Sequence, residues 1–125
     1  MNIRSILALA PVIPVLTIEH IDQAVPLARA LCAGGLRVLE VTLRTPAALP
    51  AIEAMRKSVP DAVVGVGTLA RPGDYVTAAN AGAQFGVSPG LTAEMAAAAR
   101  AASFPMLPGI MTPTDLPPGF GWGYD

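Results

Sequence analysis

The sequence predicts an α/β fold built on a parallel sheet, and three observations support this prediction. Short, β-branched apolar runs recur along the 125 residues at similar spacing. Each run is followed by a segment of helical periodicity, and such alternation is typical of parallel strands joined by crossover helices. The runs are apolar almost throughout, as expected of strands buried on both faces. With 53% hydrophobic residues, the chain has ample material for one core.

Five strands and four helices follow from this pattern. The strands are expected at 12–16, 38–43, 62–66, 84–87 and 105–107. The helices are expected at 19–33, 45–59, 71–82 and 92–102. Pro26 indicates a late start or a kink in the first helix, and Gly34-Gly35 fits a left-handed cap at its end. Thr45-Pro46 is typical of a helix start, with a capping hydroxyl and a first-turn proline.

The chain divides into two parts of a single domain. Residues 1–115 form the strand and helix repeat, and Thr112 with Asp115 makes a helix-start signature at its end. Residues 116–125 are rich in proline and glycine, so we expect an irregular tail in place of a fifth helix.

Two architectures fit the repeat, an open doubly wound sheet and a closed eight-stranded barrel. The open sheet would favour a small-molecule binding domain, but a glycine-rich nucleotide fingerprint does not follow the first strand, and 65–68 supplies only a fragment of one. The barrel explains why polar residues appear where strands end, because barrel active sites lie at that rim. The prediction is therefore an incomplete (β/α)8 TIM barrel of about five βα units.

Composition excludes several classes of function. A net charge of −1 offers no basic field for nucleic acid. The apolar run 6–16 is too short and too rich in proline to span a membrane or act as a signal peptide. Cys32 is expected to be a buried helix residue and suits the reducing cytoplasm. His20 stands apart from any histidine or cysteine cluster, so neither a metal nor another cofactor is expected.

One strand places unusual chemistry on a single face. Glu40, Thr42 and Arg44 occupy alternate positions of the run 38–45, so their side chains leave the strand on the same side. Burying a carboxylate or a guanidinium is expensive even when the two are paired. This cost suggests a functional site, and a structural ion pair is the alternative that the residues by themselves leave open.

Several motifs occur in a specific order along residues 10–115. They are Ala24-Val25-Pro26, Gly34-Gly35, 38–45, Val64-Gly65-Val66-Gly67-Thr68, Gly82-Ala83-Gln84-Phe85, Ser88-Pro89-Gly90 and Pro108-Gly109-Ile110-Met111-Thr112-Pro113. Together they closely resemble the N-terminal part of the 2-keto-3-deoxy-6-phosphogluconate (KDPG) and 4-hydroxy-2-oxoglutarate aldolase family.

The resemblance implies a class I aldolase, a (β/α)8 barrel that is typically a trimer and uses a lysine Schiff base without metal. By this resemblance Glu40 is the general acid/base, Arg44 and Thr68 hold the pyruvate carboxylate, and Pro89 forms a wall of the pyruvate pocket. The implied reaction releases pyruvate and glyceraldehyde 3-phosphate. The physical chemistry agrees, because a desolvated carboxylate suits proton transfer and a guanidinium grips a carboxylate bidentately.

The sequence departs from the family at the nucleophile. Lys57 is its single lysine and lies near the end of a predicted helix, where we expect an ordinary surface charge. The family's lysine belongs to a sixth strand that follows the five predicted here. We therefore expect a truncated chain without its own Schiff-base lysine, which tends to associate through unpaired strand edges. The alternative is a catalytically incompetent half-barrel that binds small carboxylates or needs a complementing chain.

Overall fold

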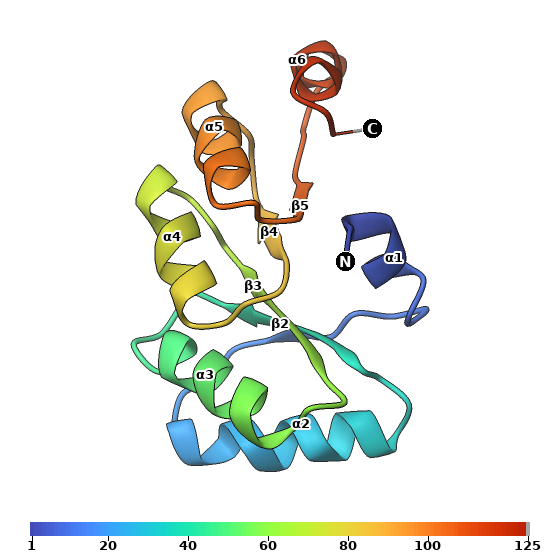
Figure 1. The fold of residues 1–125 in the computed structure, drawn as a ribbon, viewed down its shortest axis with the longest axis vertical. Helices are drawn as coiled ribbons and strands as arrows, with labels where there is room; N and C mark the ends of the chain where they lie inside the picture. The colour runs from blue at the N-terminus through green and yellow to red at the C-terminus, as the bar shows by residue number, and fades with distance from the viewer. Residues whose placement is uncertain (125) are drawn as a thin grey trace.

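The computed structural model describes residues 1–124 and contains a five-stranded parallel sheet. Its strands pair in sequence order, so each lies beside the next one along the chain (Figure 1). The strands are β1 (Val15–Leu16), β2 (Val38–Thr42), β3 (Val63–Gly67), β4 (Gly86–Ser88) and β5 (Met106–Pro108). This order, with a helix after each of the first four strands, confirms the predicted incomplete barrel.

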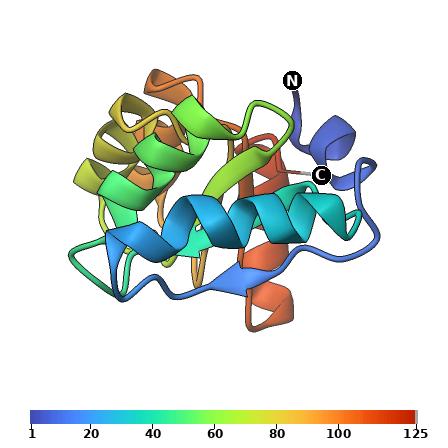
Figure 2. The same cartoon turned by 90° about the horizontal axis from the view of Figure 1, so that it is seen from below.

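Four crossover helices cover the outer face of the sheet. They are α2 (Ala24–Ala33), preceded by the 3₁₀ turn η1 (Ile21–Gln23), α3 (Ala48–Ser58), α4 (Pro72–Asn80) and α5 (Ala93–Ala101). Figures 1 and 2 show α2 and α3 side by side below the first strands, with α4 and α5 continuing around the sheet. The expected strand at 12–16 is shorter than predicted, since only its last two residues pair with β2.

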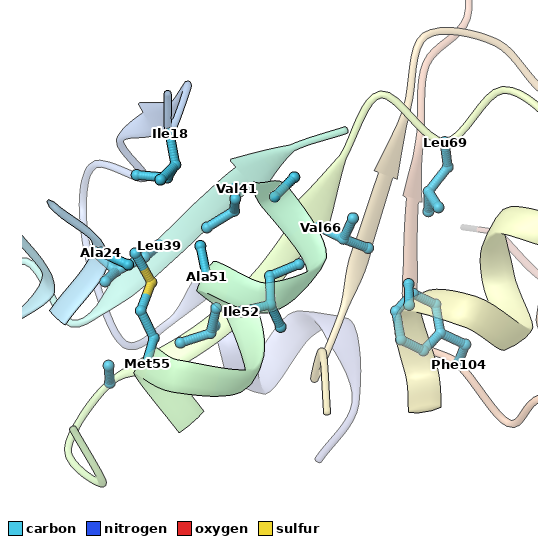
Figure 3. Close-up of a cluster of buried hydrophobic side chains, with 14 of the residues drawn as sticks. Ile18, Ala24, Leu39, Val41, Ala51, Ile52, Met55, Val66, Leu69 and Phe104 are labelled. Atoms are coloured by element: carbon cyan, nitrogen blue, oxygen red, sulfur yellow. The ribbon is translucent and has the colours of Figure 1, made fainter. Parts of the chain in front are cut away.

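The main core lies between the strands and these helices. Leu39 and Val41 of β2 meet Ile52 and Met55 of α3, and all four side chains are fully buried (Figure 3). Farther along the sheet, the ring of Phe104 meets Tyr75 of α4 edge-on, with centroids 6.4 Å apart. This layer fixes the outward-facing residues of each strand, so the intervening residues point to the inner face.

A smaller core covers the inner face at the amino ends of the strands. It consists of Ile6, Ala10, Val38, Val63 and Phe85. Ile6 belongs to α1 (Ile3–Leu7), a helix that was not among the predicted elements. In Figure 1, α1 lies across the sheet from the crossover helices. One end of the incomplete barrel is therefore closed by the N-terminal segment.

Helix ends follow local chemistry, with one correction. Pro26 occupies the third position of α2, so the late start is confirmed. Gly35 has φ +93°, and the N–H of Leu36 bonds to Leu31 O, as in a Schellman cap. The expected helix start at Thr45 was wrong, because α3 begins at Ala48. The Thr45 hydroxyl instead donates a hydrogen bond to the carbonyl of Ile18.

The expectation of an irregular tail over 116–125 also needs correction, although residue 125 lies outside the described residues. The 3₁₀ turn η2 (Pro113–Asp115) leads into α6 (Leu116–Gly121), and Thr112 N donates to Asp115 Oδ2 at 3.0 Å, which confirms the predicted start signature. Pro117 and Pro118 fall in the first turn of α6, where an N–H has no intrahelical partner to lose. The low average helix propensity of proline therefore did not prevent a helix here, because both prolines lie in its first turn.

Candidate active site

Glu40 lies in the middle of β2 on the inner face of the sheet. The outer-face positions on either side of it, Leu39 and Val41, are fully buried, whereas Glu40 is half-buried. Its carboxylate lies close over Gly67 of β3, where an ideal Cβ would fall 2.0 Å from Glu40 Oε1. Burial raises the pKa of Glu40, and the Arg44 guanidinium partly opposes this. The carboxyl group is therefore poised to hold and release a proton nearer to neutral pH than an exposed glutamate would.

Arg44 lies just outside the strand. β2 ends at Thr42, so Arg44 belongs to the following turn and not to the strand that was expected to reach residue 43. Its side chain is exposed, and its positive charge still acts on Glu40 through space. An exposed guanidinium with no ion pair within 4 Å among the described residues has donors available for an anionic ligand.

Thr68 follows β3 directly and has an unusual backbone. Its φ is +65°, in the left-handed region, which is rare for a β-branched residue. Such a conformation costs on the order of 1–3 kcal/mol and is often found at functional sites. The neighbouring main chain is tied to the strands on both sides, since Leu43 N donates to Gly67 O and Leu69 N donates to Val87 O. These bonds hold the Thr68 backbone between β2 and β4.

Pro89 follows β4 and is exposed. The chain after β5 presses against it, because Gly109 N donates to Ser88 O at 2.7 Å. A Cβ on Gly109 would lie 2.6 Å from Ser88 O and 2.7 Å from Pro89 O, so only glycine fits there. This close approach explains the Pro108-Gly109 motif and fixes the position of the Pro89 turn.

The four predicted site residues share one edge of the sheet. Because the strands are parallel, the carboxyl ends of β2, β3 and β4 lie at the same rim, and Arg44, Thr68 and Pro89 follow these ends. Glu40 lies two residues before the end of β2 and reaches this rim beside Gly67. The shared rim agrees with a common site.

Two residues near Glu40 have roles that could not be assigned from the sequence. Thr42, predicted on the same face, is buried and donates its hydroxyl to Leu16 O at 3.0 Å, so it anchors β1. Gly67 was seen only as part of a weak glycine motif, and it turns out to contact the Glu40 carboxylate. The signal that could have found it is the pair of glycines at alternate positions of β3, 65 and 67, where inner-face side chains would otherwise stand.

Other candidate groups lie away from this rim. Lys57 is exposed in the last turn of α3, which confirms the expected surface charge. Cys32 is half-buried in α2, and burial raises the pKa of its thiol, so the reactive thiolate is disfavoured. Within residues 1–124, no three potential metal ligands among His, Cys, Asp and Glu come together, and no helix is both long and apolar enough to cross a membrane.

The fold and the rim define a class of protein, a barrel-type α/β chain with a carboxylate at the mouth of its strands. A family model described as KDPG and KHG aldolase matches residues 3–125. The chain belongs to the KDPG and KHG aldolase family. The predicted family membership is therefore confirmed.

Sequence relatives agree with this assignment. The chain is 49% identical over 120 residues to the KHG/KDPG aldolase of Escherichia coli K12, covering 96% of this chain and 56% of that protein. It is 52% identical over 124 residues to the 2-dehydro-3-deoxy-phosphogluconate aldolase of Zymomonas mobilis, covering 99% and 59%. The chain thus spans a little over half the length of these relatives.

Solved structures match the fold closely. The KDPG aldolase of Zymomonas mobilis ATCC 29191 superposes with a TM-score of 0.95 at 51% identity, covering all of this chain and 60% of that one. A KDPG aldolase of Legionella pneumophila, solved with pyruvate captured at low pH as a covalent carbinolamine intermediate, gives 0.92 at 44% identity, covering 96% and 58%.

Proposed function

We propose that this chain carries the acid/base and keto-acid-binding part of a class I aldolase site. The substrate class is a 2-keto-3-deoxy sugar acid, with 2-keto-3-deoxy-6-phosphogluconate as the substrate suggested by the family and pyruvate and glyceraldehyde 3-phosphate as products. One observation carries the proposal: a half-buried glutamate with a raised pKa reaches the carboxyl-end rim of a parallel sheet beside the charge of Arg44.

Glu40 has the properties of a proton shuttle. In Schiff-base chemistry, a lysine amine adds to the C2 carbonyl, and water leaves the resulting carbinolamine with a proton from an acid. The same group, now a base, takes the proton of the C4 hydroxyl as the C3–C4 bond breaks. A carboxyl group whose pKa is raised by burial can serve in both directions near neutral pH.

The other rim residues are proposed to hold the keto acid. Arg44 offers a planar fork of N–H donors to the substrate carboxylate, and the Thr68 hydroxyl adds one more donor. Pro89 lacks an N–H and contributes a rigid wall, which Gly109 holds in place by close approach. Positioning of this kind lowers the barrier by removing the entropy of alignment.

The lysine nucleophile is proposed to come from outside residues 1–125. Lys57 is on the outer surface, in the last turn of α3, and not at the rim. Borohydride reduction in the presence of pyruvate, followed by mass spectrometry, tests this. The chain by itself should give no pyruvyl adduct, and an adduct on Lys57 would show that this lysine had been misassigned.

A second candidate function is a half-barrel that needs a complementing chain. It is supported by β1 and β5, which each pair on one side only in the described sheet. A groove of about 650 Å³ lies between α1, β5 and α6, lined in part by Ile3, Leu107 and Leu116. Unpaired strand edges beside an apolar groove favour pairing with further strands.

Complementation distinguishes the two candidates. The part of the Zymomonas mobilis relative that lies beyond the matched region would be produced separately and mixed with this chain. If the chain carries a functional half-site, borohydride trapping should yield an adduct on the added lysine, and Glu40→Gln should abolish cleavage. Association without any adduct would leave a half-barrel that binds a partner but contributes no site.

The assembly and compartment are also part of the proposal. We propose a homo-oligomer, with a trimer as the arrangement suggested by the family, located in the cytoplasm. The free, half-buried Cys32 suits a reducing compartment. Light scattering after size exclusion measures the mass of the assembly, and fractionation of the source cell locates it.

A further inference from the structure

Two glycines on the inner face of β3 leave room for different neighbours. Val38, Glu40 and Thr42 alternate along one face of β2, and Gly65 and Gly67 pair with the last two of them. The face is the inner one, because Val38 and Val63 both belong to the small core under α1. Glycine at two alternate positions of a central strand weakens the strand unless something occupies the space.

At Gly65 the occupant is a ring. An ideal Cβ there would lie 2.3 Å from Cε1 and Cζ of Phe85, a fully buried side chain. This contact belongs to the small inner core, so Gly65 serves packing. Any larger residue at this position would have to displace a buried ring.

At Gly67 the occupant is a carboxylate. An ideal Cβ there would lie 2.0 Å from Oε1, 2.8 Å from Cδ and 3.0 Å from Cγ of Glu40. The Glu40 side chain therefore leaves its own register partner, Gly65, and runs along the face of β3 toward the rim. Since the atoms concerned are the far end of a flexible side chain, a methyl group at residue 67 could be accommodated if the carboxylate moved away.

We propose that Gly67 is a positioning residue for the proposed acid/base chemistry: its missing side chain gives the Glu40 carboxylate a seat against β3, next to Thr68. The inference rests on the proposed function of Glu40 and adds a second residue to it. The seat keeps one side of the carboxylate out of water while its edge stays at the rim. Burial of this kind is also the main reason why the pKa of Glu40 is raised.

The test measures the Glu40 carboxyl group directly in the full chain. Carbon-13 labelling of glutamate and NMR titration give the pKa, with the Glu40 signal assigned by its loss in Glu40→Gln. Gly67→Ala should lower the pKa of Glu40 toward the ordinary glutamate value, because the displaced carboxylate returns to water. An unchanged pKa in Gly67→Ala would overturn the proposal.

Two matched variants separate positioning from general disruption. Gly73→Ala adds the same methyl group on α4, where nothing lies within 4 Å, so it should not lower stability and should leave the Glu40 pKa as it is. Gly65→Ala meets the Phe85 ring and should lower stability with little effect on the Glu40 pKa. Equal pKa shifts in Gly65→Ala and Gly67→Ala would point to a purely structural role and overturn the proposal.

A double-mutant cycle provides an independent readout through stability. Glu40→Asp withdraws the carboxylate by one methylene, so Gly67→Ala should cost less stability in that background than in the parent chain. Additive effects in thermal unfolding would contradict the contact. The NMR titration and the unfolding measurements do not need catalytic turnover. If trapping with a complementing chain failed, that result would count against the proposed function of the chain. The proposed role of Gly67 would still be decided by the Glu40 pKa and the double-mutant cycle.

Discussion

Glu40 shows how a single strand position acquires its chemistry from a neighbouring strand. Its carboxylate reaches over Gly67, is half removed from water, and has its pKa raised by burial against the opposing charge of Arg44. Burial has the larger effect of the two, because a dominant attraction to the Arg44 guanidinium would have lowered the pKa of Glu40. Desolvation dominates here, which suits the proton-transfer role proposed for Glu40.

The raised pKa makes a prediction for stability against pH. Because the pKa of Glu40 is raised in the folded state, folding favours its protonated form. The contribution of Glu40 to folding stability is therefore fully present below the pKa of an unfolded glutamate, about 4.3, and is lost as the pH rises through the folded pKa. Glu40→Gln should therefore be more stable than the parent chain at pH 7 and no more stable at pH 3.5. Urea unfolding at the two pH values measures the difference.

Glu94 provides a control of opposite sign. A hydrogen bond from its own backbone and one from the Thr92 side chain lower its pKa. Its contribution is therefore present at neutral pH and is lost as the pH falls through the folded pKa. Glu94→Gln should be destabilised at pH 7 relative to pH 3.5. If both glutamine variants changed in the same direction, desolvation of Glu40 would not be the cause.

We predict that Thr68 lowers folding stability through its backbone conformation and strengthens ligand binding through its hydroxyl group. Alanine keeps the Cβ that the left-handed backbone disfavours, whereas glycine removes it. Thr68→Gly should be more stable than Thr68→Ala by about 1 kcal/mol. Both variants lose the hydroxyl and should bind pyruvate more weakly in the complemented barrel, as measured by calorimetry. Equal stability of the two would mean that the φ of +65° carries no strain.

At the scale of elements, local signals predicted helix ends well where the cap is local. Thr92, the first residue of the helix expected at 92–102, caps α5, with Met95 N donating to its hydroxyl at 3.2 Å, and Gly35 ends α2 in the left-handed region. Thr45 is not the cap because α3 begins at Ala48, and the Thr45 hydroxyl donates to the carbonyl of Ile18, far away in sequence. The prediction of an irregular tail was wrong because the cost of a proline depends on its position in a helix. In α6 the prolines lie in the first turn, where this cost is small.

The cap of α5 makes a prediction at this scale. Thr92→Ala should lower the free energy of unfolding by about 1 kcal/mol, because the Met95 N–H loses its partner. Thr92→Ser keeps the hydroxyl and should stay close to the parent chain. Chemical denaturation monitored by circular dichroism measures both. A loss as large in the serine variant would assign the effect to the threonine methyl group.

At the scale of the whole molecule, the described chain leaves one side of the barrel open. The sheet has two edge strands, β1 and β5, and the segment that follows β5 carries exposed apolar side chains. Met111 and Phe120 are 89% and 57% exposed. The described fold corresponds to about 60% of the length of the KDPG aldolase chain of Zymomonas mobilis.

This opening predicts association. Produced by itself, the chain should form oligomers or aggregates, because free parallel edges and apolar surface favour pairing. Size exclusion with light scattering should give a mass above that of one 12.8 kDa chain. Addition of the complementing C-terminal part should shift the population to a defined assembly. A monodisperse monomer that melts cooperatively would contradict the prediction.

The sequence by itself determined the alternation of strands and helices, the family, and the exposed place of Lys57. These follow from periodicity, turn residues and motif order, which are local or additive along the chain. Only the tertiary structure decided that α1 closes the inner face, that Thr42 anchors β1, and that the Glu40 carboxylate rests on Gly67. The reason is physical: each of these depends on the distance between atoms of elements far apart in sequence, and such distances are set by strand register and packing.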